Sequence, residues 1–101
     1  MIIIWTKSAK SDLRVIFDYY KYNANPSVAR KIKESCFDRV EILLKNPQAG
    51  PLDETLGKLK EEHRYLVEGN YKIIYKVLSK TIFITGVFDT RQEPQKIFSK
   101  R

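Results

Sequence analysis

The sequence predicts an α+β fold of the order β-αα-βββ, with a helical hairpin packed on one face of a small antiparallel sheet. Three observations lead to this prediction. Apolar residues recur with helical spacing through the first half of the chain. They alternate with a period of two after residue 63. A break rich in proline and glycine at residues 46–51 separates the two patterns. The length favours a single domain over residues 1–101.

The composition favours an acidic or polyanionic partner. Lysine and arginine number 19 against 12 acidic residues, which gives a net charge of +7. Such a bias suits nucleic acid, ribosomes or an acidic protein, and the alternative is a basic protein that charge keeps soluble. The single cysteine and single histidine exclude a disulfide framework and a typical zinc site, so we expect no metal and no cofactor. No apolar run is long enough for a signal peptide or a membrane span, so we expect a cytoplasmic location.

The first two elements are a strand and a helix. Residues 2–5 are β-branched or aromatic, which predicts a short strand. Thr6 or Ser8 can cap the helix that follows, and the helix dipole favours Asp12 in its first turns. The apolar stripe of this helix consists of Ala9, Leu13, Ile16, Phe17 and Tyr20.

A second helix follows almost at once. Asn25 can cap it and Pro26 can take its first position, and the pattern continues to about Lys45. Its apolar stripe consists of Val28, Ile32, Cys36, Val40, Leu43 and Leu44. Because the loop between the helices is so short, they should lie antiparallel as a hairpin. After the break, residues 52–62 are polar and predict a mostly irregular surface connection.

Three strands complete the predicted fold. Residues 64–67 form the first, and Gly69-Asn70 is a two-residue hairpin signal because glycine accepts a positive φ. In the next strand, Lys72, Ile74 and Lys76 alternate with residues of the core face. A turn near Ser79-Lys80 leads to the last strand, residues 82–88. If the helices cover one face, the lysines lie on the other, which we expect to be partly open.

The candidate functional residues are cations and aromatic residues of the second half. They are Lys58, Lys60, His63, Arg64, Lys72, Lys76, Arg91, Tyr65, Tyr71, Tyr75 and Phe98. Phosphates bind lysine and arginine, and exposed bases stack on aromatic rings, so the set suits RNA contact or metal-free RNA cleavage. A structural interpretation stands beside this one. Tyr71 and Tyr75 share the core face of their strand, His63 suits a surface or hydrogen-bonded position, and Arg91 can pair with Asp89 or Glu93.

With these residues in view, the chain resembles the RelE/ParE family of toxins from type II toxin-antitoxin systems over nearly its whole length. The resemblance is carried by the first helix, by the residues around the break, and by both ends of the strand region. The segments are Trp5 with Ala9, Asp12-Leu13 and residues 16–19; Leu43-Leu44, Asn46-Pro47 and Gly50-Pro51; and residues 64–67, 69–75 and 87–94.

The resemblance implies a growth-inhibiting toxin that a co-expressed antitoxin neutralises. Some members cut mRNA in the ribosomal A site without metal, and others, the ParE-like members, poison DNA gyrase. In the first case Arg64, Lys72 and Arg91 match catalytic phosphate-contacting positions. The remaining candidates, Lys58, Lys60, His63, Lys76 and Phe98, would contact nucleic acid or a partner.

The chain lacks a Tyr or His near residues 96–98, where ribonuclease members often have a proton-transfer group. We therefore expect gyrase inhibition, with ribosome-dependent mRNA cleavage as the alternative. A third possibility is a basic interaction module with no activity. The toxin charge predicts an acidic antitoxin, whose disordered segment folds along the helices and the open sheet.

Overall fold

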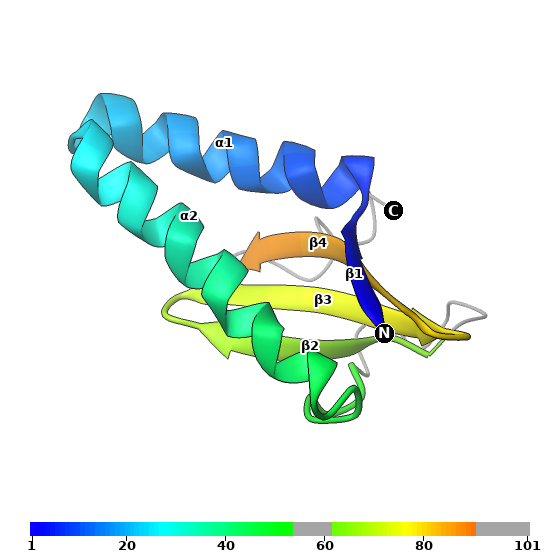
Figure 1. Cartoon of the computed structure of the whole chain (residues 1–101). Helices are drawn as coiled ribbons and strands as arrows, with labels where there is room; N and C mark the ends of the chain where they lie inside the picture. Colours follow the sequence, from blue (N-terminus) through cyan, green and yellow to red (C-terminus); the bar gives the residue numbers. More distant parts are fainter. Residues whose placement is uncertain (54–61, 91–101) are drawn as a thin grey trace.

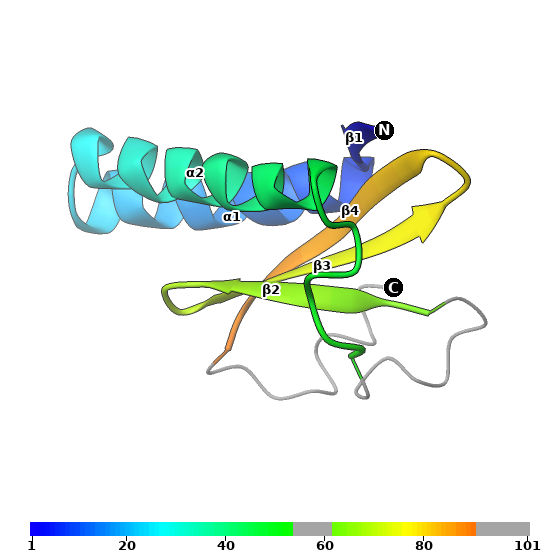
Figure 2. The same cartoon turned by 60° about the horizontal axis from the view of Figure 1, so that its bottom comes forward.

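The computed structural model describes residues 1–53 and 62–90. Figure 1 shows the order of elements, which confirms the predicted α+β class. The elements are β1 (Ile2–Trp5), α1 (Lys7–Asn23), α2 (Pro26–Val40), a 3-10 helix η1 (Glu41–Leu44), β2 (Arg64–Glu68), β3 (Tyr71–Leu78) and β4 (Thr81–Asp89). Both helices lie on the same side of the sheet (Figure 2).

The sheet has the strand order β1-β4-β3-β2, and it is mixed where we expected an antiparallel one. The pairs β2·β3 and β3·β4 are antiparallel hairpins, but β1 pairs with β4 in parallel. The reason is the connection. Short turns force neighbouring strands to reverse, whereas the chain between β1 and β4 includes both helices and two strands.

The helix starts follow the local chemistry that the sequence predicts. The Thr6 hydroxyl accepts a hydrogen bond from the Ala9 amide at 3.2 Å and donates one to the Ile84 carbonyl at 2.9 Å. Asn25 caps α2 by accepting from the Val28 amide at 2.9 Å. Each cap satisfies an amide that the helix itself leaves without a partner.

Asp12 has a different role from the one we expected. Its side chain is buried, and Oδ2 accepts a hydrogen bond from the Val87 amide at 3.1 Å. Asp12 therefore ties α1 to β4, where we had assigned it to the helix dipole. The sequence could not indicate this bond because its partners are 75 residues apart.

The main core lies between the helices and the sheet. Its buried members include Leu13, Cys36, Leu43, Tyr71 and Tyr75. The two tyrosines are thus core residues, as the structural interpretation of their face predicts. Leu44, the last member of the expected α2 stripe, is exposed instead, because the chain tightens into η1 after Val40.

The opposite sheet face is less open than we expected. Ile74 and Phe88 are fully buried there and pack with the partly buried Tyr65. Residues 52 and 53 run beside the start of β2: Leu52 bridges Arg64, and the Asp53 amide donates to the His63 carbonyl at 2.8 Å. The connection after the break thus begins with one bridge at Leu52, and the rest of the segment that we expected to be mostly irregular lies outside the described residues, apart from residue 62.

The turns agree with the sequence. Gly69 has a φ of 59° in the β2–β3 turn, and Ser79 has a φ of 54° in the β3–β4 turn. A β-bulge between Ile74 and Tyr75 interrupts the β3·β4 register. Within residues 1–53 and 62–90, neither helix is long and apolar enough to cross a membrane.

Candidate functional site

The buried hydroxyl of Tyr75 attaches residues 46–51, the segment rich in proline and glycine that follows η1, to the sheet. Tyr75 Oη donates to the Pro47 carbonyl and accepts from the Gly50 amide, both at 2.9 Å. Arg64 Nη1 donates to the Gly50 carbonyl at 2.8 Å. We call Pro47, Gly50, Arg64 and Tyr75 the loop–sheet junction. Its bonds satisfy backbone groups that would otherwise be buried without partners.

Gly50 is required at this junction for steric reasons. A Cβ placed on it would lie 2.9 Å from Tyr75 Cε1 and closer still to the Tyr65 carbonyl oxygen. Burial raises the pKa of the Tyr75 phenol above its ordinary value, and the Gly50 bond and the Arg64 charge partly oppose that rise. The phenol is therefore a neutral structural donor at physiological pH.

Lys72 is engaged on the far face of the sheet. Its Nζ lies 3.1 Å from Asp53 Oδ2 and 4.3 Å from the centroid of the Tyr65 ring. The Asp53 side chain is 1% exposed and that of Lys72 is 20% exposed. We call Asp53 and Lys72 the far-face pair. A phosphate that bound Lys72 would have to compete with a buried carboxylate for the same ammonium.

The two described cations that we expected to be catalytic, Arg64 and Lys72, do not converge on one phosphate. The register of β2 and β3 pairs Arg64 with Tyr75 of the core and Lys72 with Val67. Directly paired residues share a face, so Arg64 and Lys72 begin on opposite faces of the sheet. His63 is only 8% exposed, so its ring is not offered to solvent.

The structure does bring Arg64 and Lys76 together. Both line a cleft of about 410 Å³ at the end of β3. Asn46, Pro47 and Gln48 form another wall of it. The Lys76 ammonium lies 6.0 Å from the centroid of the Phe83 ring. Four other predicted positions, Lys58, Lys60, Arg91 and Phe98, lie outside the described residues.

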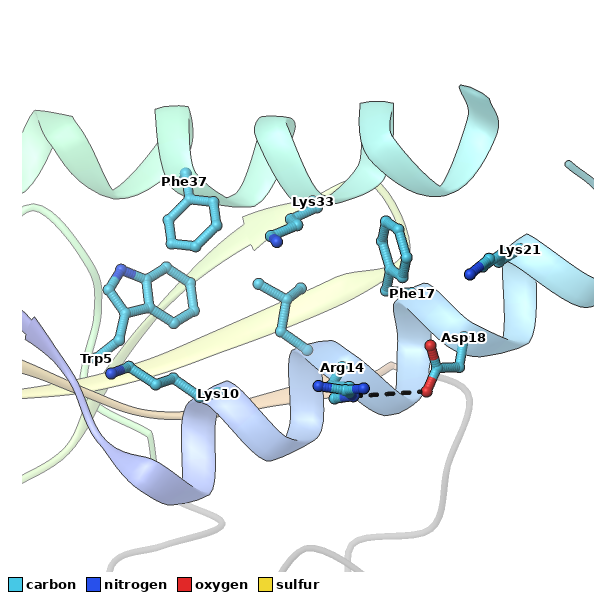
Figure 3. Close-up of a pocket in the computed structure, with 9 residues that line it drawn as sticks. Trp5, Lys10, Arg14, Phe17, Asp18, Lys21, Lys33 and Phe37 are labelled. Atoms are coloured by element: carbon cyan, nitrogen blue, oxygen red, sulfur yellow. Dashed lines mark ion pairs between the residues drawn. The ribbon is translucent and has the colours of Figure 1, made fainter. Parts of the chain in front are cut away.

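A second site, which the sequence did not predict, is a groove between the two helices (Figure 3). The helices meet at their connecting loop and diverge toward their other ends (Figure 1). The groove holds about 500 Å³. Its lining residues are Trp5, Lys10, Leu13, Arg14, Phe17, Asp18, Lys21, Lys33 and Phe37. We call this set the interhelical groove.

The groove combines an apolar floor with a cationic rim. The Trp5 and Phe37 rings contact each other with centroids 4.7 Å apart and planes tilted by 57°. Lys33 Nζ lies 5.6 Å from the centroid of the Phe17 ring. Asp18 is the acidic residue among the lining residues that the structure describes. It lies 3.8 Å from Arg14, in an exposed pair that contributes little to stability.

A signal for the groove was present in the sequence. Lys10, Arg14 and Lys21 fall on one side of α1 at helical spacing, immediately beside the apolar stripe. The sequence could not predict where these three cations lie relative to α2 and β1. Only the packing of three elements brings Phe37 and Trp5 to the same groove.

Cys36 is a core residue and not a candidate nucleophile. It is fully buried, and burial raises the pKa of its thiol to about 11, with a smaller contribution from the Glu68 charge. A thiol with such a pKa remains protonated at neutral pH and is a poor nucleophile. In the part of the chain that the structure describes, no three His, Cys, Asp or Glu side chains gather as metal ligands would.

Comparisons with known proteins agree with this geometry. The family model described as "ParE toxin of type II toxin-antitoxin system, parDE" matches residues 3–94. The chain belongs to the ParE toxin family. A solved chain of the chromosomal ParDE TA system from P. aeruginosa matches with a TM-score of 0.73 and 23% identity, over 88% of this chain and 95% of that one, which shows a shared fold. The comparison with curated proteins finds no match.

Proposed function

We propose that this chain, as a single domain, inhibits DNA gyrase in the cytoplasm and is neutralised by an acidic antitoxin. The ParE-like members that it resembles are gyrase poisons. The family to which the chain belongs consists of toxins of type II toxin-antitoxin systems. The choice of target rests on Arg64 and Lys72, the two described cations that a nuclease would use. Both are engaged by other groups of the fold. Lys72 is paired with buried Asp53, and Arg64 binds the Gly50 carbonyl.

Metal-free RNA cleavage needs groups that converge on one phosphate. Fixed cations stabilise the phosphorane charge, and a base and an acid move protons at the 2′-OH and the leaving oxygen. Arg64 and Lys72 start on opposite faces of the sheet, and the ring of His63 is buried. This arrangement supports a binding protein over a ribonuclease.

The experiment compares two assays on the same purified chain. We expect inhibition of plasmid supercoiling by gyrase, with accumulation of cleaved DNA, and no new mRNA ends on programmed ribosomes. Lys72→Ala should retain gyrase inhibition whenever circular dichroism shows that it is folded. Loss of inhibition in folded Lys72→Ala, or supercoiling left unaffected by a growth-inhibiting chain, would contradict the proposal.

Ribosome-dependent mRNA cleavage is the second candidate. The cleft that Arg64 and Lys76 share favours it, because two cations beside a polar loop outnumber the one carboxylate of the described lining, Glu62, and suit a phosphate. It predicts A-site cuts by primer extension that disappear in Arg64→Ala, Lys72→Ala and Arg91→Ala. Retained cuts in all three variants, or none from the original chain, would exclude this candidate.

A further inference from the structure

The two edges of the sheet differ in how their outward backbone groups are satisfied. The strand order places β2 at one edge and β1 at the other. At the β2 edge, the Tyr65 amide donates to the Pro51 carbonyl at 3.1 Å. Further along the same edge, the Val67 carbonyl accepts a hydrogen bond from Arg39 Nε at 3.1 Å. These bonds occupy backbone groups that another strand would need, so the β2 edge is closed.

The β1 edge lacks such cover. The Ile2 amide donates to the Lys80 carbonyl at 3.3 Å, on the side of β4. Because successive residues of a parallel strand point their backbone groups to alternate sides, those of Ile3 and Trp5 point away from β4. Among the described residues, no turn, loop or cap bond engages the backbone of Ile3 or Trp5. The edge therefore offers two amides and two carbonyls.

The side chains of β1 leave this edge able to pair. Ile3 and Trp5 pack against the core, so Ile2 and Ile4 point to the face opposite the helices, where they are 59% and 40% exposed. Residues 2–5 include no charge and no proline, which are common means of blocking an exposed edge. Isoleucine and tryptophan also favour extended strands. The edge is thus apolar and has a strong preference for β structure.

We propose that β1 of one copy pairs with β1 of a second copy in antiparallel orientation, which forms a weak homodimer with a continuous sheet. One register uses every outward group: Ile3 of each copy lies opposite Trp5 of the other and exchanges two hydrogen bonds with it. Ile4 then lies on the twofold axis, opposite Ile4 of the second copy, at a Cα separation of about 4.5 Å. This inference does not depend on the proposed gyrase target.

Charge and area select this occupant and set its strength. An identical strand opposes no like charges within residues 2–5, and an acidic strand would gain no ion pair there. A strand of four residues buries far less than the roughly 800 Å² per partner of a standard interface. The net charge of +7 on each copy opposes association further. The dimer should therefore form at high concentration and strengthen with added salt, which screens the repulsion.

A cysteine on the proposed axis tests the register. Ile4→Cys should form an intermolecular disulfide when diamide oxidises it, because the two Cα atoms lie within the range that a disulfide spans. Ile2→Cys is the control: residue 2 is more exposed, but its two copies would lie about 13 Å apart along the strands. The original chain is the blank, since Cys36 is fully buried. Electrophoresis without reductant measures the yields.

Sedimentation equilibrium measures the dimer without a cross-link. Ile4→Lys places two ammonium groups on the axis and should weaken dimerisation at least tenfold. Val67→Lys is the matched control, because it makes the same change of charge at an exposed position of the closed edge. The control should lose much less affinity. Circular dichroism establishes that both variants are folded.

Each other outcome overturns the proposal. Equal disulfide yields in Ile2→Cys and Ile4→Cys indicate random collision. Equal weakening in Ile4→Lys and Val67→Lys indicates overall charge, and a dimer that ignores Ile4→Lys uses another surface. An Ile4→Cys chain that cross-links to an extended acidic peptide bearing a cysteine, and not to itself, assigns the edge to a different protein. These assays contain no gyrase, so their failure leaves the proposed target untouched.

Discussion

The sheet and the interhelical groove use the same cationic residue types for different purposes. On the sheet, Arg64 binds a backbone carbonyl and Lys72 binds a buried carboxylate. In the groove, the ion pair that Arg14 forms among the described residues is a long, exposed one with Asp18. The loop–sheet junction and the far-face pair therefore hold the fold together, whereas the groove cations are available to a partner.

Substitutions of these two groups of cations should therefore act in different ways. A cation engaged inside the fold affects activity through stability, because its removal takes a favourable contact from a buried polar group. A cation on an exposed rim affects association and leaves stability nearly unchanged. Loss of toxicity in Arg64→Ala or Lys72→Ala is thus meaningful only beside an unfolding measurement.

The largest loss of stability is expected at Gly50, where the backbone of the loop–sheet junction lies closest to the sheet. Gly50→Ala should destabilise the fold by about 3 kcal/mol, because its Cβ would overlap the Tyr65 carbonyl and crowd Tyr75. Urea unfolding measures this. Gly69→Ala is the control: space around that Cβ is open, and only the positive φ opposes it, at about 1 kcal/mol. Equal losses at the two glycines would contradict the steric argument.

The far-face pair should give the next largest effect. Lys72→Ala removes the ammonium that lies 3.1 Å from the buried Asp53 carboxylate and should cost about 2 kcal/mol, below the usual range for a buried pair because Lys72 is partly exposed. Lys80→Ala, at an exposed turn, should be neutral. Thermal unfolding of both variants tests the difference, and a neutral Lys72→Ala would return this lysine to the functional candidates.

The junction hydroxyl should have a smaller effect with a distinct pH dependence. Tyr75→Phe removes the partner of both the Gly50 amide and the Pro47 carbonyl and should cost about 1.5 kcal/mol at neutral pH. The folded pKa of Tyr75 lies above its ordinary 10.0. Its contribution is therefore complete below pH 10 and declines as the pH rises above that value, because the unfolded chain releases the proton first.

Unfolding curves of the original chain and of Tyr75→Phe across this alkaline range test the assignment. The stability difference between them should narrow above pH 10. A difference that stays constant would show that ionisation of another group causes the alkaline loss.

The smallest stability effect is expected in the groove. Arg14→Glu and Lys33→Glu should each change the free energy of unfolding by less than about 0.5 kcal/mol, because both side chains are exposed. Thermal unfolding checks this. A large loss in either variant would mean that the groove cations hold the fold as the sheet cations do, and the contrast between the regions would disappear.

Much of the fold could be predicted because it depends on local chemistry. The caps at Thr6 and Asn25, the turn at Gly69 and the alternation in β3 each involve residues within a few positions of one another. The period of two also predicted that Tyr75 belongs to the core. Much less of the candidate site could be predicted. Arg64 and Lys72 were correctly recognised as cations on strands, but nothing in the sequence indicated what each of them binds.

The order of elements, both helix starts, the hairpin turns and the excess of positive charge follow from the sequence alone. The packing of distant segments sets three other features: Lys72 pairs with Asp53, Asp12 binds the Val87 amide, and β1 lies parallel to β4. It also decided that Trp5 and Phe37 meet to form the groove. The physical reason is range: periodicity and caps act within a few residues, whereas ion pairs, strand order and grooves depend on which distant segments pack together.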